Sequence, residues 1–262
     1  AEAYKLELEN QKAQLEIVGL TLEMVKMVKP DVTPDQQMLY AMKMLVQTDG
    51  ESGGQYYKWD RSDFGAYSQM RDVTKMMEEA ERIDSKVYTA LGKFFRAFYF
   101  LNLTLTFGDV PYSQALQGET QAEYAPPVYD AQKDVFKGIL AELKEANDIL
   151  AAENTIIKGD IIYGGDVTKW RKLVNAFRLK VLLLLSKQEA DADLNLKSTF
   201  AQIVTSEPLF AGNEDDAKLV FLDQQGNRYP EFNSSGYGSG MYMDSTFIRR
   251  LQDREDPRLF IY

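Results

Sequence analysis

Apolar side chains recur at three- and four-residue steps along most of the chain, and this period predicts α-helices. Two such series open the sequence: Leu15, Val18, Leu22, Val25 and Val28, then Met38, Ala41, Met42 and Leu45. Pro30 ends the first predicted helix. The second follows Thr33, with Pro34 at its first position, where the missing N–H of proline is not needed for a helical hydrogen bond.

Six further helices are predicted by the same criterion. They cover Phe64–Arg82, Ser85–Phe107, a stretch that begins near Tyr129, a stretch with Thr168 as its N-cap, Leu194–Thr205 and Asp244–Gln252. The helix over Ser85–Phe107 is apolar on most sides. One stripe holds Leu91, Phe94 or Phe95, Phe98, Leu101 and Leu105, and another holds Tyr99, Leu103 and Phe107. Such a helix is expected to be buried among others.

The spacing of these helices predicts the fold class. Helix pairs recur at roughly 35–45 residues, which is typical of helical-repeat proteins. We therefore expect an all-α fold of tetratricopeptide-like helical pairs that support irregular loops, in a single domain over residues 1–262. Leu219–Leu222 is predicted to form a short strand.

The stretch FYFLNLTLTFGDVPY, residues 98–112, is the longest apolar run and stops abruptly. It is shorter than the ~20 residues that cross a membrane as a helix. Gly108 suits the left-handed position after a helix end, Asp109 can bind the turned backbone, and Pro111 cannot continue the helix. We interpret this segment as the end of a buried helix, and a ligand-binding loop is the alternative.

Composition excludes several classes of chemistry. The chain has neither histidine nor cysteine, so it lacks the commonest general base, the commonest zinc ligand and all thiol chemistry. The net charge is −10, which disfavours binding to nucleic acid. Acidic pairs are numerous, but none lies in a context that indicates catalysis. We expect no enzyme, no catalytic residue and no cofactor.

Three motifs are weak candidates for ligand or metal sites. GYGSG at residues 236–240 lacks the spacing of a dinucleotide-binding loop. Asp60–Gly65 begins like a calcium loop, but Phe64 stands where an oxygen ligand is required and Arg71 where the bidentate glutamate belongs. Glu214–Asp216 is predicted to be a solvated acidic cluster. No metal site is expected.

Two loops rich in aromatic residues are the stronger candidates for a binding site. One contains Tyr56, Tyr57 and Trp59; the other contains Tyr229, Phe232, Tyr237 and Tyr242. Loops run along protein surfaces, and exposed tyrosine and tryptophan are rigid contact residues whose flat faces suit sugar rings. The alternative is that the loops fold back and bury these side chains.

Four stretches, taken in order, resemble a known family. They are FFRAFYFLNL (94–103) with FGDVPY (107–112), PVYD (127–130) with the apolar helix after it, GD (159–160) with YGGD (163–166) and KWRKLVNAFRLK (169–180), and DPRL (256–259). The chain is similar in these segments to the SusD/RagB family of Bacteroidota, surface lipoproteins that capture nutrients. The match covers residues 86–187 well and 244–260 more thinly.

This resemblance implies a fold and a function. The fold would be all-α with tetratricopeptide-like pairs, and the protein would be a lid over a SusC-like TonB-dependent transporter on the outer membrane. The ligand would be a glycan, held by an arc of aromatic side chains, and Trp59 lies in the loop where such a residue would fall. Members carry a lipid on an N-terminal cysteine and often reach twice this length, so the chain is expected to lack its anchor leader and to be a fragment.

Two alternatives to glycan binding stay open from the sequence. The first is an oligopeptide-binding lid of the RagB type. The second is a helical-repeat interaction scaffold with no small ligand.

Overall fold

The computed structural model describes residues 39–40, 42–48, 64–118, 126–225, 227–228 and 241–260. The chain forms two compact units, one made of Ala1–Met27 with Phe64–Leu219 and the other of Val28–Asp63 with Val220–Tyr262. The expectation of a single domain over residues 1–262 stays a prediction.

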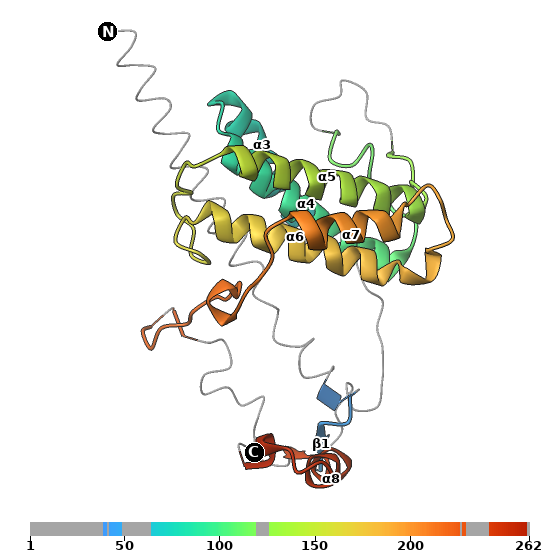
Figure 1. Ribbon diagram of the computed structural model, residues 1–262, viewed down its shortest axis with the longest axis vertical. Helices are drawn as coiled ribbons and strands as arrows, with labels where there is room; N and C mark the ends of the chain where they lie inside the picture. The colour runs from blue at the N-terminus through green and yellow to red at the C-terminus, as the bar shows by residue number, and fades with distance from the viewer. Residues whose placement is uncertain are drawn as a thin grey trace. The chain divides into compact units, whose positions relative to one another are not determined.

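The described part of the first unit is a row of antiparallel helices, and the fold is all-α as expected (Figure 1). Each helix packs against the next in sequence, and α5 and α6 lie side by side. The helices are α3 (Ala66–Arg82), α4 (Lys86–Phe107), α5 (Gln132–Ala152), α6 (Val167–Leu184) and α7 (Leu196–Ser206), with short 3₁₀ turns at Ser186–Gln188 and Asn213–Asp215. The predicted bounds of α3, α4 and α7 are confirmed to within two residues, and α5 begins three residues after its predicted start near Tyr129.

Helix α4 is the centre of this unit. Leu91 and Phe100 on this helix are fully buried. The ring of Phe94 meets Trp170 edge-on at 5.9 Å and Phe177 at 5.5 Å, which joins α4 to α6. The prediction of a helix buried on most sides is thus confirmed. Leu105 is an exception: it is 50% exposed, because it lies on the same face of α4 as the exposed Asn102 and Thr106.

The GDVPY segment ends α4 and also begins α5. Gly108 has a positive φ of +79°, as the sequence predicted, but its ψ of −115° lies outside the left-handed helical region, in a conformation that a side chain penalises. The Asp109 carboxylate accepts a hydrogen bond from the amide of Gln132, the first residue of α5, at 2.9 Å. Val110 pairs with Asp130 in an isolated bridge. The segment is therefore a connector between two helices within the scaffold.

Tyr112, the last residue of that segment, fills the space over α5. Its amide donates to the Asp130 carboxylate at 2.8 Å, and its hydroxyl donates to Glu142 Oε1 at 2.8 Å. A Cβ at Gly138 would lie 2.3 Å from the Tyr112 ring, so glycine is required for this close approach. Burial chiefly, and then the charge of Glu142, raises the pKa of the Tyr112 phenol far above its ordinary value.

The loop before α6 is organised by Asp160. Its carboxylate accepts hydrogen bonds from the amides of Ile162 and Gly165, each at 2.9 Å, and from the indole N–H of Trp170 at 2.8 Å. The helix itself is capped by Asp166, which accepts from the amides of Thr168 and Lys169. The prediction of Thr168 as N-cap is wrong by two residues, because the Asp166 side chain satisfies the first free amides.

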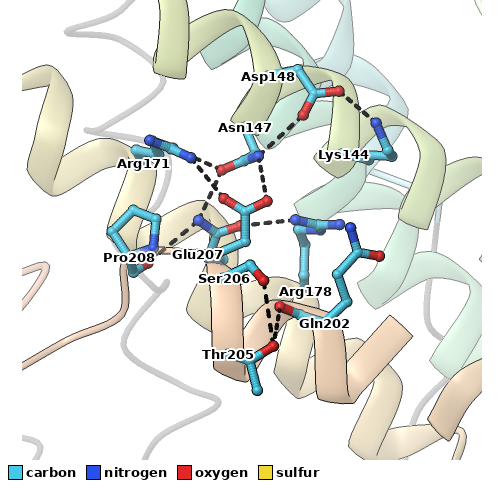
Figure 2. A network of polar contacts seen from close by, with 11 residues as sticks. Lys144, Asn147, Asp148, Arg171, Arg178, Gln202, Thr205, Ser206, Glu207 and Pro208 are labelled. Carbon is cyan, nitrogen blue, oxygen red and sulfur yellow. Dashed lines mark hydrogen bonds and ion pairs between the residues drawn. The ribbon is translucent and has the colours of Figure 1, made fainter. Parts of the chain in front are cut away.

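A network of polar contacts joins α5, α6 and the end of α7 (Figure 2). Asn147 and Asn175 are buried, and Asn175 Nδ2 donates to Asn147 Oδ1 at 2.8 Å. Arg171 donates both to Asn147 Oδ1 and to Glu207 Oε2, the latter at 2.7 Å. Because an unpaired buried polar group is costly, these contacts fix the register of the helices.

The acidic segment after α7 is not fully solvated, contrary to expectation. Asp215 is 2% exposed and forms an ion pair with Lys172 of α6 at 2.8 Å. The amide of Ala211 also donates to Asp215, and both contacts lower the pKa of its carboxyl. Glu214 and Asp216 are exposed, as expected for a surface cluster.

The described part of the second unit is small. It contains the strands β1 (Leu45–Gln47) and β2 (Met241–Met243), helix α8 (Ser245–Gln252) and a 3₁₀ turn at Pro257–Phe260. The helix predicted through Met42 and Leu45 is wrong there, since the chain turns at Lys43, which has φ +58°, and continues as a strand. The strand predicted at Leu219–Leu222 is also wrong, because these residues are irregular and pair with no strand among the described residues. Helix α8 is confirmed.

Within the described residues, no helix combines the length and the apolarity that crossing a membrane would require.

Candidate ligand-binding site

The two strands of the second unit form an antiparallel ladder whose register bears on the aromatic loops. Leu45 faces Met243, Val46 faces Tyr242 and Gln47 faces Met241. The amide of Asp244 extends the ladder by donating to the carbonyl of Met44 at 2.8 Å. Paired Cα atoms in such a ladder lie about 4.5–5.5 Å apart.

This register brings together the ends of two segments that are far apart in sequence. The segment with Tyr56, Tyr57 and Trp59 begins nine residues after Gln47, and the segment with Tyr229, Phe232 and Tyr237 ends four residues before Met241. Gln47 and Met241 are partners, so both aromatic segments are attached at the same end of one ladder. Periodicity did not reveal this, because a three-residue strand gives too short a pattern.

Tyr242 is the one predicted site residue that lies within the described part of the chain. It stands in the middle of β2 and is 60% exposed. Its side chain is therefore available to solvent, as a contact residue would be. The other six predicted residues, Tyr56, Tyr57, Trp59, Tyr229, Phe232 and Tyr237, lie outside the described residues, and their roles stay predictions.

The contacts around the ladder hold it in place. Tyr40 is 5% exposed, and its hydroxyl contacts Gln47 Oε1 at 3.4 Å. Asp244 caps α8 by accepting from the amide of Thr246 at 2.8 Å, and this hydrogen bond is the main reason that the pKa of its carboxyl is lowered. The strand that bears Tyr242 is thus joined directly to a capped helix.

The chemistry of the described residues is that of contact and hydrogen bonding. Groups of three or more acidic side chains arranged to hold a metal ion do not occur among them. The ladder itself presents aliphatic, amide and phenol groups, which can pack and hydrogen-bond but have no nucleophile with an adjacent base.

The sequence of the chain matches the model of a known family. A sequence model of the SusD-like family, described as starch-binding and associating with the outer membrane, matches residues 12–262. No curated protein sequence matches at a significant level.

Two solved structures are similar to nearly the whole of this chain. A SusD homolog from Bacteroides fragilis is 51% identical with a TM-score of 0.82, and the match covers 95% of this chain and 52% of that structure. An outer membrane protein from Bacteroides vulgatus, described as involved in nutrient binding, is 48% identical, with a TM-score of 0.82 and the same coverage.

A more distant structure supports the fold alone. A chitin-binding SusD homolog from Flavobacterium johnsoniae is 17% identical with a TM-score of 0.67, and the match covers 93% of this chain and 53% of that one. This chain therefore spans about half the length of the structures it matches.

Proposed function

Because this chain belongs to the SusD-like family, we propose that it captures glycans at the outer face of the outer membrane and passes them to a SusC-like TonB-dependent transporter. The family is one of nutrient-binding proteins associated with the outer membrane rather than of enzymes. Transport, the lipid anchor and the extracellular position are the parts of the proposal that rest on the family resemblance.

The observation that carries the binding proposal is the β1–β2 ladder. It attaches both aromatic segments at one point, so that side chains from each could contact the same sugar chain. Tyr242 stands exposed on that ladder. Aromatic faces stack on the C–H faces of sugar rings, while amides such as that of Gln47 can take sugar hydroxyls. A protein without histidine or cysteine is suited to such reversible contact.

A glycan is favoured over a peptide by the chemistry of the proposed site residues. All seven are aromatic, and five of them are tyrosines that combine a flat apolar face with a hydroxyl. The family description names starch. We therefore propose a polysaccharide or oligosaccharide as ligand, and propose no cofactor, catalytic residue or nucleic-acid partner.

Affinity electrophoresis in native gels that contain soluble starch or a soluble chitin derivative tests this proposal. The wild-type chain should be retarded in one of these gels. Trp59→Ala should abolish the retardation, and Tyr242→Ala should weaken it, because each change removes an aromatic face; aromatic pairs gain about 0.5–1.5 kcal/mol beyond the area they bury, and we expect a sugar face on a ring to gain a similar amount. Tyr129→Ala is the matched control, since Tyr129 is 63% exposed but belongs to the first unit.

Other outcomes distinguish the alternatives. Co-purification of short peptides, identified by mass spectrometry, would favour an oligopeptide-binding lid. Mobility that is unchanged by all glycans and by Trp59→Ala would favour a scaffold without a small ligand. Equal losses in Tyr242→Ala and Tyr129→Ala would contradict a site at the ladder.

A further inference from the structure

Helix α8 has an apolar side and a cationic side. Phe247, Ile248 and Leu251 form the apolar side, and Leu251 is 4% exposed. Arg249 and Arg250 lie on the other side of the helix, where both are exposed. The helix contains no acidic residue, so its exposed side carries two positive charges in a chain whose net charge is −10.

The two arginines of α8 have no carboxylate partner in the part of the chain that the structure describes. Arg258, which follows the helix, forms an ion pair with Asp256 at 2.6 Å. Arg249 and Arg250 form no such pair with any described residue. Their guanidinium groups are therefore available to an anion from outside, and the planar fork of N–H donors of arginine suits acidic oxygens.

Helix α8 is joined directly to the ladder that bears Tyr242. The amide of Asp244 donates to the carbonyl of Met44 at 2.8 Å, and the Asp244 side chain then caps the helix. Three residues of extended chain and one turn of helix separate Tyr242 from Arg249, so their Cα atoms are at most about 16 Å apart. A short oligosaccharide stacked on Tyr242 could therefore extend to Arg249.

A further cation lies near the start of α8. The hydrogen bond from the Thr246 amide chiefly lowers the pKa of the Asp244 carboxyl, and the charge of Lys43 contributes to the same shift. Lys43 is exposed and lies two residues before β1. The nearest acidic residues beyond the helix, Asp253 and Glu255, follow its last turn. Positive charge therefore extends from the ladder along the exposed side of α8.

We propose that this side of α8 makes the binding site prefer acidic glycans, whose carboxylate or sulfate groups contact Arg249 and Arg250 while a neighbouring sugar stacks on Tyr242. The inference rests on the proposed function, because it extends the site at the ladder. Neutral glycans make only the aromatic contacts and bind more weakly. The net charge of −10 gives the chain no general attraction for an acidic polymer, so the preference must come from these local cations.

Biolayer interferometry on immobilised polysaccharides tests this preference with the whole 262-residue chain. Two pairs of polymers are used, polygalacturonate with its methyl ester and dextran sulfate with dextran, and each pair shares one sugar backbone and differs in charge. At ~50 mM salt, one acidic polymer should bind more tightly than its neutral partner, and the difference should shrink as salt rises. Arg249→Gln with Arg250→Gln should raise the Kd for that acidic polymer by about three- to thirtyfold and leave the neutral one unchanged.

The matched control removes two exposed cations of the first unit that also form no ion pair with described residues. Arg71→Gln with Lys187→Gln should change the Kd for the acidic polymer by less than about twofold. Circular dichroism should show that all variants keep their helix content. Equal binding of the acidic and neutral partners overturns the inference, and so do equal losses in the two double variants.

Tyr242→Ala separates failure of this inference from failure of the proposed function. It should weaken the binding of both members of a pair, because both stack on the same ring. If neutral polymers bind through Tyr242 and acidic ones bind no better, the preference is wrong and the glycan site stands. If the chain binds none of these polymers, and neither starch nor a chitin derivative, both the inference and the proposed function are wrong.

Discussion

At the scale of single residues, Gly108 is the position where the backbone conformation depends most clearly on the absence of a side chain. A Cβ there would touch nothing within 4 Å, so any penalty comes from its φ of +79° rather than from a clash. Sequence alone placed this glycine correctly, because the apolar helix, the Asp109 and the Pro111 all mark the same stop.

Gly108→Val should lower the free energy of unfolding by about 1–3 kcal/mol, since a β-branched residue is disfavoured at positive φ. Urea unfolding followed by circular dichroism measures this. Thr106→Val is the control, because Thr106 is exposed in the last turn of α4 and should change stability by less than about 0.5 kcal/mol. Equal stability of Gly108→Val and the wild type would refute the proposed strain.

Polar residues were harder to place from sequence. Asp160 accepts hydrogen bonds from three backbone amides and the Trp170 indole, and Asp215 is buried against Lys172. Both belong to acidic, glycine-rich stretches that look like solvent-exposed loops when read in isolation. One partner of each comes from α6, Trp170 for Asp160 and Lys172 for Asp215, so these contacts depended on which helix the loop met.

At the scale of elements, the connection from α4 to α5 depends on the pair formed by Gly138 and Tyr112. In an ordinary helix, replacing glycine by alanine stabilises by about 1 kcal/mol, because glycine has more freedom in the unfolded chain. At Gly138 a Cβ would lie 2.3 Å from the Tyr112 ring, so the contact should outweigh that gain.

Gly138→Ala should therefore destabilise the protein by about 1–3 kcal/mol, as expected for overpacking. In a Tyr112→Leu background the same change should cost much less, or should stabilise. The interaction free energy comes from a double-mutant cycle in urea. If the cost of Gly138→Ala is the same in both backgrounds, the two residues do not pack as described.

Helices were predictable as elements because each repeats its apolar face over several turns. The strands were not, because each has three residues and its partner lies far away in the sequence. The pairing of Val46 with Tyr242 follows from tertiary contacts. The candidate site was therefore predicted as two separate loops, and the structure supplied the ladder that connects their ends.

At the scale of the whole molecule, the lack of histidine and cysteine shapes the dependence of stability on pH. Burial alone would raise the pKa of Asp130, but hydrogen bonds from the Ser113 amide and hydroxyl and the Tyr112 amide outweigh it and lower the pKa. Burial chiefly, with the charges of nearby Tyr129 and Asp130, raises the pKa of Tyr67 to about 12.

The signs of these pKa shifts define two pH ranges in which the folded protein loses stability, one acidic and one alkaline. A carboxyl with a lowered folded-state pKa contributes stability that is present above its unfolded pKa of about 4 and is lost as pH falls below that value. A phenol with a raised pKa contributes stability that is present below about pH 10 and is lost as pH rises toward its folded-state pKa.

We therefore expect the urea midpoint to be nearly constant between about pH 5 and pH 9, to fall below about pH 4 and to fall again above about pH 10. Chemical unfolding in buffers across this range measures it, and Tyr67→Phe should reduce the alkaline loss. A clear change of midpoint between about pH 6 and pH 8 would contradict the prediction, because no histidine or cysteine side chain titrates there.

The sequence by itself determined the helical scaffold, its sharp stops and the kinds of chemistry that the chain lacks. Periodicity and the positions of glycine and proline act within short segments, and composition is known from the sequence without any structure. Tertiary structure alone decided the pairing of β1 with β2, the burial of Asp215 and the exposure of Leu105. The physical reason is that each depends on which distant segment lies opposite, and a residue's own neighbours in sequence do not encode that.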